Sequence, residues 1–122
     1  MPKVWIVNLR GHNYRPAEEH GELKYITVGY VSQGSLDGIL YEVVKSIAMS
    51  EPGDFLLPSG MLPLNLMAVA AWWHKHKSLT MLLWDHKRDK NKGGYRKFTV
   101  DPEHLDYLFE ALTCQEDTSK SP

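Results

Sequence analysis

The stretch VWIVNLRGHNY, residues 4–14, begins as a buried strand and ends in polar side chains. Residues 4–7 are all apolar, so both faces of this strand would be covered, as in the parallel sheets of α/β proteins. The chain then changes abruptly to asparagine, arginine, glycine and histidine. Such an ending predicts the carboxyl-end edge of a parallel sheet, where ligands bind.

The rest of the chain alternates strands with helices. Strands are predicted over residues 24–31, 54–58, 79–84 and 95–100, and helices over 36–49, over 61–73 and from about residue 101 onward. This order predicts a single-domain, Rossmann-like α/β fold with a mostly parallel sheet of about five strands and helices on both faces. The last strand could return antiparallel through the glycine pair that ends the charged loop 85–94. We expect residues 1–114 to form the domain and 115–122 a disordered tail.

Composition limits the classes of function. The chain has 122 residues, 43% of them hydrophobic, and a formal net charge of -1, which argues against a general duplex-DNA-binding protein. The single cysteine, Cys114, leaves no intramolecular disulfide, and no apolar run is long enough to cross a membrane. We therefore expect a cytoplasmic protein that does not bind a membrane.

Polar side chains gather where the predicted strands end, and these are the candidate site residues. They are Asn8, Arg10, His12, Asn13 and Tyr14 after the first strand, Ser32, Gln33 and Ser35 after the second, Ser59, Gly60 and Asn65 after the third, and Asp85, Lys87 and Arg88 after the fourth. Because the carboxyl ends of parallel strands share one edge of the sheet, these groups are expected to meet there.

The residue types at this edge favour an anionic ligand. The segment LPSGMLPLN, residues 57–65, leads from a strand through a glycine turn into a helix, whose first N–H groups could face a phosphate or could simply form a tight turn. Lys87 and Arg88 could attract a phosphodiester or belong to a solvated hairpin. His12 could transfer a proton or only hydrogen-bond the backbone.

Other chemistries find little support in the sequence. His74 and His76 are two residues apart on a predicted helix, which is the wrong spacing for a shared metal, and no metal or other cofactor is expected. Ser59 lacks the GxSxG setting of a nucleophilic serine, so a serine hydrolase is not expected.

The strand ending in NLRGHNY, the DFLLPSG strand before a helix, and LLWDHKRDK resemble the small CRISPR-associated accessory proteins with CARF-like Rossmann cores. That resemblance implies a homodimer, or a higher homo-oligomer, that binds a cyclic oligoadenylate, cyclic tetra-adenylate in particular, across its two-fold axis. It also implies a metal-independent ring nuclease. The positions of His12, Arg10, Lys87 and Arg88 after strand ends make them the expected catalytic residues.

Three alternatives remain open at this point. The chain could sequester the same nucleotide without cleaving it. It could be a small nucleotide-processing enzyme, for which Asp85 is the best-placed carboxylate nucleophile. It could also be a subunit whose apolar surface, including its tryptophans, serves assembly.

Overall fold

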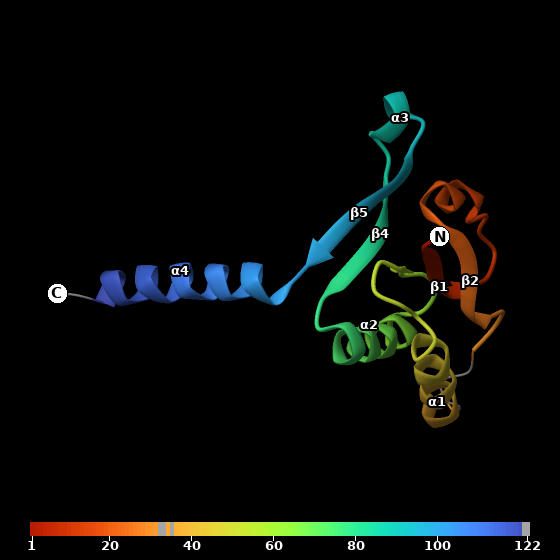
Figure 1. The fold of residues 1–122 in the computed structure, drawn as a ribbon, viewed down its shortest axis with the longest axis horizontal. Helices are drawn as coiled ribbons and strands as arrows, with labels where there is room; N and C mark the ends of the chain where they lie inside the picture. The colour runs from red at the N-terminus through yellow and green to blue at the C-terminus, as the bar shows by residue number, and fades with distance from the viewer. Residues whose placement is uncertain (32–33, 35, 121–122) are drawn as a thin grey trace.

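A computed structural model describes residues 1–31, 34 and 36–120, and for residues 115–120 it describes the backbone alone. The elements follow in the order β1 (Lys3–Leu9), η1 (Arg15–His20), β2 (Glu22–Val28), α1 (Leu36–Ile47), β3 (Phe55–Leu57), α2 (Leu62–His76), β4 (Leu79–Asp85), α3 (Arg88–Asn91), β5 (Gly94–Val100) and α4 (Pro102–Lys120). The five strands form one sheet in the order β2-β1-β3-β4-β5. Figure 1 shows this arrangement.

The prediction of a mostly parallel α/β sheet in one small domain is confirmed. Strands β1 to β4 run parallel, and β5 returns antiparallel beside β4, with Trp84 opposite Tyr95. The short α3 lies in the hairpin between them and contains three residues of positive φ, Asp89, Lys90 and Asn91. The charged segment 85–94 is therefore the turn of the antiparallel edge.

The strand order decides which face each connection covers. Connections between parallel strands are right-handed. The chain crosses the sheet in one direction from β1 to β2, and in the opposite direction from β2 to β3 and from β3 to β4. The first connection and the two later ones therefore lie on opposite faces of the sheet. Accordingly α1 and α2 cover one face together, through Val43, Leu64 and Trp72. The 3-10 helix η1 covers the other face, where Ala17 packs against Ile6 and Leu57.

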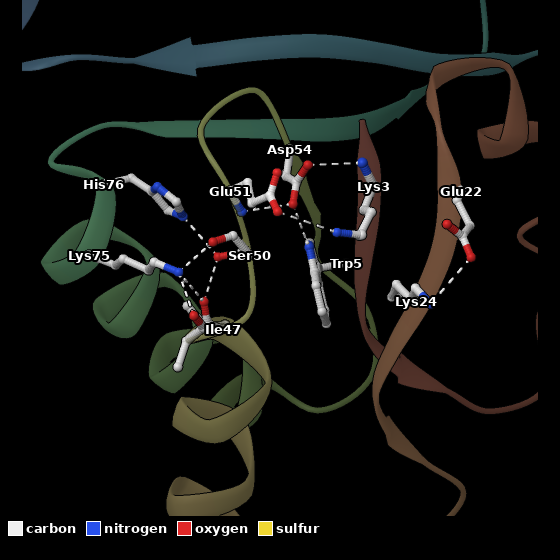
Figure 2. A network of polar contacts seen from close by, with 11 residues as sticks. Lys3, Trp5, Glu22, Lys24, Ile47, Ser50, Glu51, Asp54, Lys75 and His76 are labelled. Carbon is white, nitrogen blue, oxygen red and sulfur yellow. Dashed lines mark hydrogen bonds and ion pairs between the residues drawn. The ribbon is translucent and has the colours of Figure 1, made fainter. Parts of the chain in front are cut away.

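The amino-end edge of the sheet is held by two polar clusters (Figure 2). Asp54 accepts hydrogen bonds from the Lys3 N–H, the Trp5 indole and the Glu51 N–H, at 3.0, 3.0 and 2.9 Å. Burial raises the pKa of Asp54, but these donors and the charge of Lys3 outweigh it and hold the pKa below its ordinary value. Asp54 thus stays ionised while it joins the start of β1 to the start of β3.

Lys75 makes the second cluster, at the end of α1. Its ammonium donates to the carbonyl of Ala48 at 2.6 Å and to the carbonyl of Ser50, and the Ile47 carbonyl lies 3.4 Å away. The last carbonyls of a helix have no partner within the helix and form its negative pole. A lysine of α2 therefore closes α1 and fixes the two helices to each other.

Helix α4 departs from this layered arrangement. Only Asp101 separates it from β5, and it projects away from the rest of the chain (Figure 1). It continues to Lys120, into the stretch for which the sequence predicts a tail. From Asp106 to Cys114 every side chain is exposed.

Candidate functional site

A pocket of about 520 Å³ opens at the carboxyl ends of β1, β3 and β4. It lies where the strand order reverses, because β2 and β3 flank β1 on its two sides. The lining residues are His12, Asn13, Tyr14, Leu57, Pro58, Ser59, Gly60, Leu82, Leu83, Trp84, His86 and Tyr95. Aromatic and aliphatic carbon therefore makes up most of its wall.

Trp84 is the largest of these side chains, and its ring is held on several sides. Tyr95 meets it edge-on at 5.1 Å between ring centroids. Its indole N–H donates to Nδ1 of His86 at 3.1 Å, so a neutral His86 carries its proton on Nε2. Gly93 lies so close that an added Cβ would be 2.4 Å from the indole ring. The indole is 44% exposed despite these contacts, and the hairpin presents it in one orientation.

Tyr14 and Tyr95 add two buried phenol rings to the wall. Burial raises the pKa of Tyr95, and the neighbouring Tyr14 raises it further, so its hydroxyl stays neutral and can donate a hydrogen bond. Tyr14 also meets the ring of His12, with 6.1 Å between centroids. The pocket thus joins aromatic faces to a few polar groups.

The turn between β3 and α2 is fixed by hydrogen bonds within the chain. The Ser59 hydroxyl donates to the Asn8 carbonyl and accepts from the Asn8 N–H, both at 2.9 Å. Asn65 accepts from the Ser59 N–H at 2.8 Å and donates back to the Ser59 carbonyl at 3.0 Å. Gly60 has a φ of 78°, and a Cβ there would be 2.8 Å from Cβ of Asn8. This turn is consequently a rigid wall of the pocket.

The structure brings five of the sequence-predicted site residues to this pocket: His12, Asn13, Tyr14, Ser59 and Gly60. Asn8 is buried beneath the turn, and its Oδ1 has no hydrogen-bond partner among the described residues. Asn65 caps the turn. Ser32, Gln33 and Ser35 lie outside the described residues.

The predicted cations lie apart from the pocket wall. Arg10 stacks over Tyr30, with 5.2 Å from its guanidinium carbon to the ring centroid. Arg88 pairs with Glu19 at 3.3 Å. Lys87, Asp85 and Arg96 line an adjoining hollow, which shares Leu83, Trp84 and His86 with the pocket. A catalytic role for Arg10, Lys87, Arg88 and His12 stays a prediction.

Sequence reasoning missed Trp84 and Tyr95 as site residues. A tryptophan in an apolar run is more often part of a core, and this prior hid Trp84. The signal that could have found them is the hairpin register, because the glycine pair implies that Trp84 and Tyr95 lie side by side on one face.

A serine and a histidine also meet at the amino-end edge, but their geometry is structural. Ser50 Oγ lies 2.8 Å from Nε2 of His76 and donates its own proton to the Ile47 carbonyl at 2.5 Å. Since a hydroxyl has one proton, the histidine must be the donor in their hydrogen bond. Burial lowers the pKa of His76, and nearby Lys75 lowers it further against an opposing effect of Asp54. Ser50 is therefore not an activated nucleophile.

Two further findings concern metals and membranes. The described residues contain no group of three or more His, Cys, Asp or Glu side chains able to hold a metal ion. Within the same residues, none of the helices is both long enough and apolar enough to span a bilayer.

Comparison with known proteins gives one match. The model of a family described as Phage Pam3 gp32-like protein matches residues 2–102, so the match ends at the first residue of α4. No curated protein and no solved structure matches the chain.

This match overturns the resemblance to CRISPR-associated CARF-like proteins, because the family is a phage family. The expectation of cyclic oligoadenylate binding and ring-nuclease cleavage in antiviral defence, and the alternative of sequestering the same nucleotide, are wrong with it. The resemblance rested on the order of elements, which unrelated α/β proteins share.

Proposed function

The chain belongs to the phage Pam3 gp32-like family, and we propose that its α/β domain binds a small planar, largely apolar ligand in the pocket at the carboxyl ends of β1, β3 and β4. The observation that carries this proposal is the aromatic wall formed by Tyr14, Trp84 and Tyr95. A volume of about 520 Å³ is within the range of small-molecule sites.

The wall suits a flat ring better than a flexible chain. The Trp84 ring is oriented by Gly93, Tyr95 and His86 before any ligand arrives, so little ordering is needed on binding. Leu57 and Leu82 provide apolar contact beside it. A ring that stacks on an aromatic side chain typically gains about 1–3 kcal/mol.

The polar groups of the pocket indicate hydrogen-bonding atoms at the edge of that ring. His12, Asn13 and His86 come from the segments after β1 and β4 and can each donate or accept. Ser59, in contrast, already uses its hydroxyl hydrogen on the Asn8 carbonyl. The arrangement favours recognition of a heteroaromatic ring over nucleophilic attack by the serine.

The proposed compartment is the cytoplasm. Its support is the single cysteine, Cys114, which leaves the chain without an intramolecular disulfide.

An NMR titration of the full chain tests the ligand proposal. The probes are indole, adenine and quinoline, with cyclohexanecarboxamide as a non-planar control. We expect at least one planar probe to shift the Trp84 indole N–H and the Gly60 amide, and the non-planar control to shift neither.

Two aromatic substitutions sharpen the test. Trp84→Ala should weaken binding about tenfold or more, as the loss of one stacking partner implies. The exposed Tyr41, on α1 and away from the pocket, provides a matched control, and Tyr41→Ala should bind like the wild type. If no planar probe shifts these signals, or if folded Trp84→Ala binds with unchanged affinity, the proposal is refuted.

A further inference from the structure

Helix α4 carries an apolar stripe that nothing in the described part of the chain covers. Leu105, Leu108, Phe109 and Leu112 recur at the i, i+3, i+4, i+7 spacing of one helix face. Leu108, Phe109 and Leu112 are 41, 68 and 60% exposed. A helix that displays such a stripe to water is only marginally stable alone, so the stripe indicates a docking partner.

The sheet has a matching gap in its helix layer. On the face that α1 and α2 cover, the antiparallel edge bears Met81 and Leu83 of β4 and Phe98 and Val100 of β5. Leu83 and Phe98 are 37 and 46% exposed. The part of the sheet built from β4 and β5 extends beyond α2 (Figure 1). Met81 and Val100 still pack against the core, so Leu83 and Phe98 are the side chains of this strip that stay open to solvent.

Helix α2 provides the second side of this apolar surface. Its residues Ala71 and Lys75 face α1, as the hollow that they line with Val44 shows. The opposite side of α2, at helical spacing, bears Leu62, Leu66, Val69 and Trp73. Leu62 and Leu66 are 68 and 59% exposed. We call the surface formed by this side of α2 and by the β4–β5 strip the edge groove.

The charge of α4 is compatible with the edge groove. Between residues 102 and 114, α4 carries three acidic residues, Glu103, Asp106 and Glu110, and no lysine or arginine. Lys77 after α2 is an exposed cation, and Arg96 on β5 is also exposed but already pairs with Asp85 at 3.9 Å. At helical spacing the three acidic side chains lie away from the apolar stripe, so α4 can dock its stripe without burying a carboxylate.

The link between β5 and α4 determines whose helix can fill the groove. It consists of Asp101 alone, whose Oδ1 accepts the His104 N–H at 2.9 Å and caps the helix. Pro102 fixes its own φ and favours an extended conformation at Asp101, so the chain continues outward. Folding back over β5 would require a full reversal within one residue, and short rigid hinges of this kind favour exchange between copies.

We propose that two copies of this chain exchange their α4 helices, so that the apolar stripe of each α4 lies in the edge groove of the other. The exchange is reciprocal and therefore forms a closed two-fold dimer. It goes beyond the ligand pocket, which lies at the carboxyl ends of β1, β3 and β4, and does not depend on the proposed ligand.

Light scattering after size exclusion, at micromolar concentration, tests the exchange on the full chain. We expect a dimer for the wild type. Leu112→Asp on the stripe and Phe98→Asp in the groove should each yield monomers, whereas Tyr41→Asp, on an exposed apolar residue of α1, should leave the dimer intact. Leu112 is remote from the domain core, so its substitution keeps the test valid if Phe98→Asp fails to fold.

Lengthening the hinge separates exchange from other dimers. Insertion of Gly-Ser-Gly between Asp101 and Pro102 should let α4 fold back into its own groove and convert the dimer into a monomer. A monomeric wild type would overturn the proposal. So would a dimer that survives both the hinge insertion and Leu112→Asp, because that result would mean that α4 takes no part in association.

Discussion

Replacing Lys75 with methionine tests whether this side chain closes α1. The ammonium donates to the carbonyls of Ala48 and Ser50 at the end of the helix (Figure 2). Methionine keeps the apolar stem and removes only the charge and the donors. The last carbonyls of α1 would then depend on water, and the favourable charge at the negative pole of the helix would be lost.

The expected cost follows from two contributions. Hydrogen bonds that involve a charged group typically contribute about 1.5–3 kcal/mol, but Lys75 is exposed and water replaces part of this. The interaction with the helix pole adds about 0.3–1 kcal/mol. We therefore expect Lys75→Met to lower the free energy of unfolding by about 1.5 kcal/mol, or the melting temperature by about 6 °C.

Urea unfolding followed by circular dichroism measures this change, and Lys77→Met is the matched control. Lys77 lies at the same end of α2, is exposed, and its side chain makes no hydrogen bond within the described residues. Its substitution should change stability by less than about 0.5 kcal/mol. Equal stabilities of the two variants would refute the reasoning, because the loss would then reflect charge alone rather than the closure of α1.

Three further predictions concern acid stability and the hairpin. Folding lowers the pKa of Asp54, so its contribution to the free energy of unfolding is complete above the unfolded pKa of about 3.9 and is lost as the pH falls through the folded pKa. Asp54→Asn should therefore flatten the acid limb of the stability curve measured by urea melts. An unchanged acid limb would contradict this. Folding also lowers the pKa of His76, so the unfolded chain takes up this proton first and stability should decline as the pH falls below about 6.5. His76→Gln should abolish that decline. A decline that persists in the variant would rule out His76 as its source. Gly93→Ala should destabilise the hairpin by about 2 kcal/mol and shift the emission of Trp84, because a Cβ would be 2.4 Å from the indole at a φ of 90°. The control Gly38→Ala, whose Cβ meets open space in α1, should instead be stabilising by about 0.5–1 kcal/mol in thermal melts, and equal effects of the two would count against the steric argument.

The place of the site could be predicted better than its composition. The polar residues after strands indicated the carboxyl-end edge, and His12, Tyr14 and Gly60 do line the pocket there. The predicted cations were attributed to the same edge from their position in the sequence alone. Arg10 and Arg88 instead contact Tyr30 and Glu19, because side-chain length and local partners determine where a charge lies.

The family could not be deduced from the order of elements. Alternating strands and helices are common to many unrelated α/β proteins, so the likeness to CARF-like proteins carried no information on ligand or activity. Only the match over residues 2–102 corrected it.

The sequence by itself determined the elements, the parallel sheet and the edge at which the pocket lies, because hydrophobic periodicity and strand ends are local properties of the chain. Only the tertiary structure decided the strand order, which placed α1 and α2 on one face, and the pairing of Trp84 with Tyr95, which built the aromatic wall. It alone also revealed that α4 leaves the domain while the edge groove stays uncovered. These features depend on contacts between residues far apart in the chain, and no local pattern encodes them.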